Sequence, residues 1–125
     1  MAQYDRSRWP PVPVASVTVV HPKKDLESGP LTGKLDTGAD LTVIPGRLLA
    51  ELSLQPKGVF RTRVWGASWR AAPFVFARLR VDGFEIPSII CLAADREDVL
   101  LGRNVLNQFL ITLDGKNLSV RMEDP

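Results

Sequence analysis

The stretch GKLDTGADLTVIP, from Gly33 to Pro45, sets an aspartate, a threonine and a glycine between two apolar segments. Both flanking segments have the character of buried strands, so we expect Asp36 to be poorly solvated, which is a costly position for a charge. A carboxylate in such a position indicates function. Asp, Thr and Gly are also common turn residues, so these three letters alone fit an ordinary turn as well.

Length and composition describe an ordinary globular domain. The chain has 125 residues, of which 45% are hydrophobic and 24% charged, enough for one domain with a core of its own. The formal net charge of +2 argues neither for nor against nucleic acid, and no long basic run accompanies it. No segment has the length of an apolar membrane span, and residues 1–14 lack the apolar core of a signal peptide. We therefore expect a soluble cytoplasmic protein with no membrane or nucleic-acid partner.

The order of apolar and turn residues predicts a mostly β domain with one or two short helices. Residues 1–13 are polar and rich in proline, so we expect a flexible N-terminal arm, followed by a single domain over residues 14–125. A short helix is expected at 46–54, with its leucines on one side. Strands are expected at 14–22, 31–38 and 41–45, and three more within 59–94. Residues 95–109 are expected to form a short strand followed by a short helix, and residues 110–122 a hairpin.

The long β region contains two turns. The first is expected at residues 65–68, between two tryptophans, and the second at Asp82 and Gly83. The strand between them alternates, with one apolar face made of Val75, Ala77, Leu79 and Val81. The stretch RTRVWGASWR (61–70) could also form a basic aromatic surface for nucleic acid. We prefer a hairpin whose arginines face solvent.

Other reactive side chains offer no second site. The chain has one cysteine, Cys91, which cannot form an internal disulfide and lies in an apolar run, so we expect a buried thiol. His21 is the single histidine and precedes a proline, which favours a surface loop over a metal ligand. No metal, cofactor, Ser-His-Asp or Cys-His arrangement is predicted.

Two motifs together resemble the retropepsin family, the small aspartic proteases of retroviruses and their cellular and bacterial relatives. LDTGADLTVI (35–44) is similar to the active-site loop of that family, and LLGRNVLNQF (100–109) to its second signature of two apolar residues, Gly-Arg and a short helix. Gly102 follows Asp36 by 66 positions (102 − 36), which fits the family. The resemblance implies a retropepsin-like acid-protease half-barrel that is active as a homodimer.

The chain contains only half of the catalytic site of such an enzyme. Aspartic proteases use two carboxylates that share one proton, and here only Asp36 lies in an Asp-Thr-Gly sequence. Asp82-Gly83 and Asp114-Gly115 lack the hydroxyl residue and fit hairpin turns. A two-fold homodimer would bring Asp36 and its copy together. The expected activity is therefore hydrolysis of peptide bonds by a water that two Asp36 carboxylates activate, with no cofactor.

The resemblance also assigns roles to neighbouring residues. Thr37 and Gly38 would form the active-site loop and lock the two chains together. Arg103 would form a structural ion pair with Asp40. The residues expected to contact substrate are Ala39, Asp40, Leu100 and the flap tip at Trp65, Gly66 and Ala67. This flap tip departs from the family pattern, because it has one glycine and a tryptophan on each side.

Two further expectations concern activity. Ala39 cannot donate a hydroxyl hydrogen bond to the ionised carboxylate, so we expect a bell-shaped pH profile with an optimum around pH 5 to 6. The alternative function is a dimeric peptide-binding or dimerisation module on the same fold without catalysis, since the flap tryptophans could block the cleft. Cleavage of a peptide library, with and without a transition-state analogue, would distinguish the two.

Overall fold

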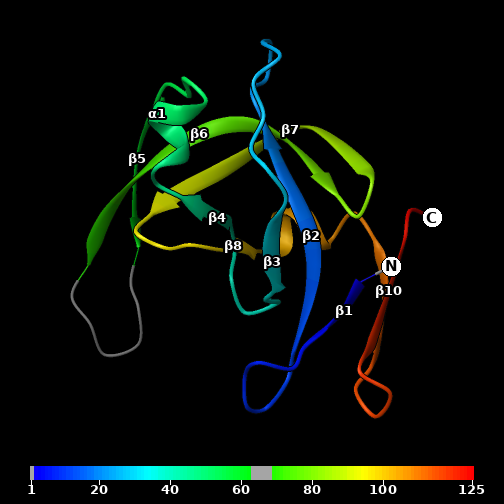
Figure 1. Ribbon diagram of the computed structural model, residues 1–125. Coiled ribbons are helices and arrows are strands. Elements are labelled where there is room, and N and C mark those ends of the chain that lie inside the picture. Colours follow the sequence, from blue (N-terminus) through cyan, green and yellow to red (C-terminus); the bar gives the residue numbers. More distant parts are fainter. Residues whose placement is uncertain (1, 63–68) are drawn as a thin grey trace.

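The computed structural model describes residues 2–62 and 69–125, and this part of the chain forms a single mixed sheet with two short helices (Figure 1). The helices are α1 (Leu48–Glu51) and α2 (Arg103–Leu106). The strands are β1 (Ala2–Asp5), β2 (Val12–Val20), β3 (Leu31–Leu35), β4 (Thr42–Pro45), β5 (Gly58–Thr62), β6 (Arg70–Val81), β7 (Phe84–Ala94), β8 (Val99–Leu101), β9 (Leu110–Asp114) and β10 (Ser119–Glu123).

Six of the described strands close into a barrel. The sheet runs β5-β6-β7-β4-β8-β3-β2-β1-β10-β9, and β2 also pairs with β6. This additional pairing joins Val17 to Val81 and closes the ring β6-β7-β4-β8-β3-β2. β5 extends the sheet at one end, and β1, β10 and β9 extend it at the other. The predicted mostly β fold with two short helices is confirmed.

Alternation of side chains explains why these segments are strands. Along β6, Val75, Ala77, Leu79 and Val81 are fully buried, while the residues between them are exposed or half-buried, as the period of two predicts. β2 shows the same pattern, with Val17 and Val19 fully buried. The barrel interior is therefore filled by one face of each strand.

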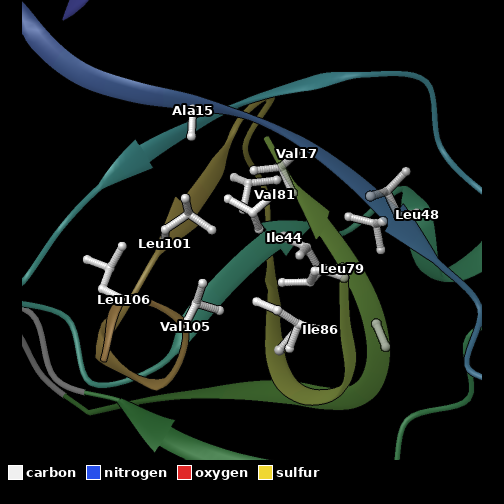
Figure 2. Packing of buried hydrophobic residues seen from close by; sticks show 14 of the residues in the cluster. Ala15, Val17, Ile44, Leu48, Leu79, Val81, Ile86, Leu101, Val105 and Leu106 are labelled. Atoms are coloured by element: carbon white, nitrogen blue, oxygen red, sulfur yellow. The ribbon is translucent and has the colours of Figure 1, made fainter. Parts of the chain in front are cut away.

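The core joins these strands to the helices. Figure 2 shows valine, leucine and isoleucine side chains from opposite walls of the barrel meeting in its interior. Helix α1 contributes Leu48, and Leu52 just after the helix is also buried, whereas Leu49 packs at the edge of the core. Cys91 lies in the same core, where burial raises the pKa of its thiol to about 12. The predicted buried thiol is confirmed, and it is protonated at neutral pH.

The N-terminal segment differs from the flexible arm that its composition predicts. Residues 2–5 form β1, which pairs with β2 through Tyr4 and Pro13 and with β10 through Ala2 and Val120. Proline disrupts helices and the interior of central strands, but it is tolerated near the start of a strand. The N-terminal segment can therefore form a strand here, because β2 and β10 both offer pairing edges. The first and last strands of the chain therefore lie side by side (Figure 1).

Two predicted turns are present, and one lies outside the described residues. The turn between β6 and β7 lies at Asp82 and Gly83, which both have positive φ. The turn between β9 and β10 begins after Asp114. The turn expected at residues 65–68 falls in the segment that is not described. No helix in residues 2–62 or 69–125 is long and apolar enough to cross a membrane.

We predict that Gly33→Ala destabilises the fold, because β3 packs tightly against both neighbours at this residue. A Cβ at Gly33 would lie 2.5 Å from Cγ2 of Val17 in β2 and 3.1 Å from Cδ1 of Leu101 in β8. Such overpacking costs about 1–3 kcal/mol of unfolding free energy, which urea titration measures. Gly29→Ala is the matched control, since no heavy atom lies within 4 Å of its added Cβ, and we expect a change within about 0.5 kcal/mol. Equal stability of the two variants would contradict this account of the β3 packing.

Candidate active site

The aspartate lies in the loop that joins β3 to β4, where the chain leaves the barrel wall. The backbone N–H of Asp36 donates to the carbonyl oxygen of Leu101 (3.0 Å), so the loop begins as a continuation of the β3–β8 pairing. One carboxylate oxygen of Asp36 accepts a hydrogen bond from the N–H of Gly38 (2.9 Å), and the Asp36 carbonyl accepts one from Ala39 (3.2 Å). These bonds hold the carboxylate in one orientation.

Asp36 is less buried in a single chain than the sequence predicts. Its side chain is half-buried, and Thr37 and Gly38 are exposed. A single chain therefore shields Asp36 from solvent only in part. Asp36 directly follows β3, and the loop continues to the start of β4 at Thr42.

The start of α2 is bonded directly to this loop. The N–H of Arg103 donates to the carbonyl oxygen of Ala39 (2.9 Å), and the N–H of Asn104 donates to that of Asp40 (3.3 Å). A Cβ at Gly102 would lie 2.5 Å from the carbonyl carbon of Leu41, so only glycine allows this approach. The second sequence motif therefore serves as a support for the first.

A buried polar group connects the two motifs further inside. Thr42 is 0% exposed, and its hydroxyl donates to Oδ1 of Asn104 (2.9 Å) and accepts from the N–H of Gly102 (3.1 Å). Nδ2 of Asn104 donates to the carbonyl oxygen of Ile90 (2.9 Å), which ties the group to β7. Sequence analysis did not assign a role to Thr42 or Asn104. The available signals were a polar residue inside an apolar strand and an amide directly after Gly-Arg.

Arg103 contacts both the loop backbone and Asp40. Its Nη1 donates to the carbonyl oxygen of Thr37 (2.7 Å), and its Nη2 forms an ion pair with the Asp40 carboxylate. The structure therefore brings Arg103 and Asp40 together. The two side chains are 43% and 82% exposed, so the charge pair by itself contributes little to stability. The hydrogen bond to Thr37 adds a restraint on the loop that does not depend on charge.

An open cavity of about 680 Å³ lies beside the loop. One side is the loop and β4, and the other is the β5–β6 hairpin with one residue of β7. Its lining residues are Gly38, Ala39, Asp40, Leu41, Val43, Phe60, Arg61, Trp69 and Leu92. The cavity has the volume and the largely apolar lining that a peptide side chain requires.

The other predicted substrate residues are placed differently. Leu100 lies half-buried on β8, opposite Val43, and is not part of the lining found in the described residues. Trp65, Gly66 and Ala67 lie outside the described residues. A second cavity of about 340 Å³ lies near His21, Lys57 and Phe76 and shares no lining residue with the loop.

Nothing in the described residues gathers the ligands of a metal site. No group of three or more His, Cys, Asp or Glu side chains could hold an ion in residues 2–62 and 69–125. His21 accepts hydrogen bonds at Nδ1 from the N–H groups of Lys23 and Lys24 (3.0 Å each), so it shapes the turn that follows β2. The chemical group that the loop offers is one oriented carboxylate beside an apolar cavity.

Comparison with solved structures shows the same fold in retroviral proteases. The solution structure of the simian foamy virus (mac) protease matches with a TM-score of 0.56 and 16% identity, over 75% of this chain and 91% of that chain. Two structures of a foamy viral protease-reverse transcriptase, one with double-stranded DNA and one with an RNA/DNA hybrid, match with TM-scores of 0.58 and 0.56 and identities of 19% and 20%. They cover 78% and 75% of this chain, but this chain spans only 16% and 12% of theirs.

The chain thus has the fold of retroviral-type acid proteases. The aspartyl protease family matches residues 24–105, which is more than half of the chain and includes the whole first motif and the start of the second, through Gly102 and Arg103. The chain belongs to this family. A search of curated proteins found no match.

We predict that Thr42→Val weakens the link between the loop and α2. The variant keeps the side-chain shape but leaves the buried N–H of Gly102 without its acceptor, which costs about 1–3 kcal/mol of unfolding free energy. Hydrogen exchange of the Gly102 amide should accelerate at the same time. Thr32→Val, at an exposed position of β3, is the matched control and should change stability by less than about 0.5 kcal/mol. Unchanged stability and exchange in Thr42→Val would show that the buried hydroxyl does not support the loop.

Proposed function

We propose that this protein is an aspartic endopeptidase whose active site forms between two copies of the chain. The observation that carries the proposal is the Asp36 carboxylate, oriented by the Gly38 N–H at the tip of a loop next to an apolar cavity. One carboxylate is half of what aspartic-protease chemistry requires. Symmetry supplies the other half when a second copy docks with its Asp36 loop facing the first.

The proposed reaction needs one proton on the pair. The ionised Asp36 acts as general base and removes a proton from a water held between the two carboxylates, while the protonated Asp36 donates a hydrogen bond to the scissile carbonyl. The water oxygen bonds to the carbonyl carbon while the protonated Asp36 transfers its proton to the carbonyl oxygen, which gives a tetrahedral diol and leaves the pair singly protonated. The proton on the pair then passes to the leaving amine as the C–N bond breaks, and one diol hydroxyl returns its proton to the pair as the C=O bond forms again.

The residues around Asp36 hold this geometry. Thr37 and Gly38 are exposed on one chain, which leaves them free to contact the partner loop in the proposed dimer. Ala39 and Asp40 line the cavity and would contact the substrate backbone. By resemblance, Leu100 and the flap tip at Trp65, Gly66 and Ala67 would complete the substrate contacts.

The setting in which the protein acts is also a proposal. Cys91 is free and buried, and it is the single cysteine of the chain, so folding requires no disulfide and suits a reducing compartment. We propose a cytoplasmic enzyme that acts on peptides or proteins and uses no cofactor or nucleic acid.

Asp36→Asn tests the chemistry. The amide keeps the size of the side chain but cannot accept a proton from water, and in a homodimer both copies change together. We expect peptide cleavage to fall by a factor of at least about 10²–10⁴. Asp25→Asn, an exposed change in the connection from β2 to β3, is the control and should cleave normally. Wild-type cleavage in Asp36→Asn would overturn the assignment, whereas peptide binding without cleavage by the wild type would support a binding module.

Mixing of subunits tests whether two chains share one site. Wild-type chains mixed with an excess of Asp36→Asn chains should form mixed dimers that hold one carboxylate, so activity per wild-type chain should fall. The same excess of Asp25→Asn should leave it unchanged. Sedimentation over a concentration series should show association over the range in which specific activity rises. A strictly monomeric protein with full activity would contradict the shared site.

A further inference from the structure

The walls of the cavity beside the Asp36 loop carry an uneven distribution of charge. Its apolar surface comes from β4, β5 and β7 through residues such as Val43, Phe60 and Leu92. Two charged residues, Asp40 and Arg61, are among the described residues that line it. The two residues differ in whether an opposite charge pairs with them, and this difference decides which net charge the cavity presents to a bound peptide.

Asp40 is already paired. Its carboxylate bonds to Nη2 of Arg103, and the same guanidinium also bonds to the carbonyl oxygen of Thr37. The Asp40–Arg103 pair therefore presents little net charge to the cavity. A cationic side chain of a peptide would have to compete with Arg103 for the same carboxylate.

Arg61 has a different environment. Its guanidinium lies over the ring of Trp69, 5.8 Å from the ring centre, and among the described residues it forms no ion pair with a carboxylate. A cation–π contact holds the guanidinium near the ring and leaves its N–H groups available for hydrogen bonds. Those N–H groups match the two oxygens of a carboxylate.

We propose that Arg61 makes the enzyme prefer substrates with acidic side chains at a distance from the cleaved bond. This inference rests on the proposed function and names a substrate class for the same cleft. The apolar wall formed by Phe60 and Leu92 receives the hydrocarbon part of a glutamate or aspartate, and Arg61 binds its carboxylate. Because the proposed dimer is two-fold symmetric, a second Arg61 acts in the other half of the cleft.

The centre of the cleft has the opposite preference. The singly protonated Asp36 pair carries one negative charge, so an acidic side chain directly beside the cleaved bond is repelled. The specificity profile therefore has a distinctive shape: acidic residues are disfavoured next to the cleaved bond and favoured further away on both sides. A general attraction of a weakly basic protein for acidic peptides would produce the same central minimum, but its outer preference would not depend on Arg61.

The test is a set of peptides that differ at one position by Glu, Gln or Lys, with kcat/KM measured for each. At the outer positions we expect wild type to prefer Glu over Gln by about two- to fivefold, the range of one exposed charge pair, and the preference to decrease with added salt. Arg61→Gln should remove the preference, and Arg61→Glu should reverse it in favour of Lys. Lys24→Glu makes the same charge change in the exposed turn after β2 and should retain the wild-type profile.

Two results would overturn the inference: equal kcat/KM for Glu and Gln at every outer position, or a Glu preference that persists in Arg61→Gln. A loss of folding in the variants would appear as a lower melting temperature. In that case Arg61→Lys, which keeps the charge, serves as the second variant and should retain part of the Glu preference.

If wild type cleaves none of the peptides, the proposed function fails separately. Binding requires no catalysis, so fluorescence anisotropy of the same peptides with Asp36→Asn still tests Arg61. Tighter binding of Glu peptides than of Gln peptides, lost when Arg61→Gln is added to Asp36→Asn, supports the inference. Equal binding of Glu and Gln peptides by Asp36→Asn overturns it.

Discussion

Backbone packs directly on backbone where Gly102 meets Leu41 and Thr42, and the arrangement of the site follows from this contact. A side chain at residue 102 would collide with the Leu41 carbonyl group, so β8 and β4 could not approach as they do. The close approach lets the N–H groups at the start of α2 reach the carbonyl oxygens of the aspartate loop. It also lets the Gly102 N–H reach the buried hydroxyl of Thr42. The loop is thereby held by bonds from a neighbouring element as well as by its own short turn.

The position of Asp36 is understandable when folding and assembly are considered separately. A single chain leaves the carboxylate half-buried and its neighbours Thr37 and Gly38 exposed, so folding alone does not require full desolvation of a charge. In the proposed dimer, the desolvation and the repulsion between two carboxylates arise only on docking. Sharing one proton lowers that repulsion, and the same shared proton is what the chemistry uses.

Arg103 and Arg61 show how one type of side chain serves two purposes at the two walls of the cleft. Arg103 binds a backbone carbonyl and Asp40, and it neutralises the one acidic residue among the described residues that line the cavity. Arg61 rests on Trp69 and keeps its hydrogen-bonding edge available. The contacts of Arg103 restrain the loop. In our proposal, Arg61 selects substrates by the charge of their side chains.

The sequence by itself determined the fold class and the positions of most strands along the chain. The alternation along β6, the buried Cys91 and the two motifs around Asp36 and Gly102 all depend on residue type and local spacing, which a linear sequence records. The pairing of β1 with β2 and β10 could not be predicted from it, because proline and polar residues suit both a free arm and a strand whose partners come from distant parts of the chain. Tertiary structure alone decided that Thr42 bonds to Asn104 and Gly102, about 60 residues away, since pairing at that range depends on how the strands stack. It also decided the solvation of Asp36, because burial depends on which groups pack around the loop and not on the hydrophobicity of its flanking strands.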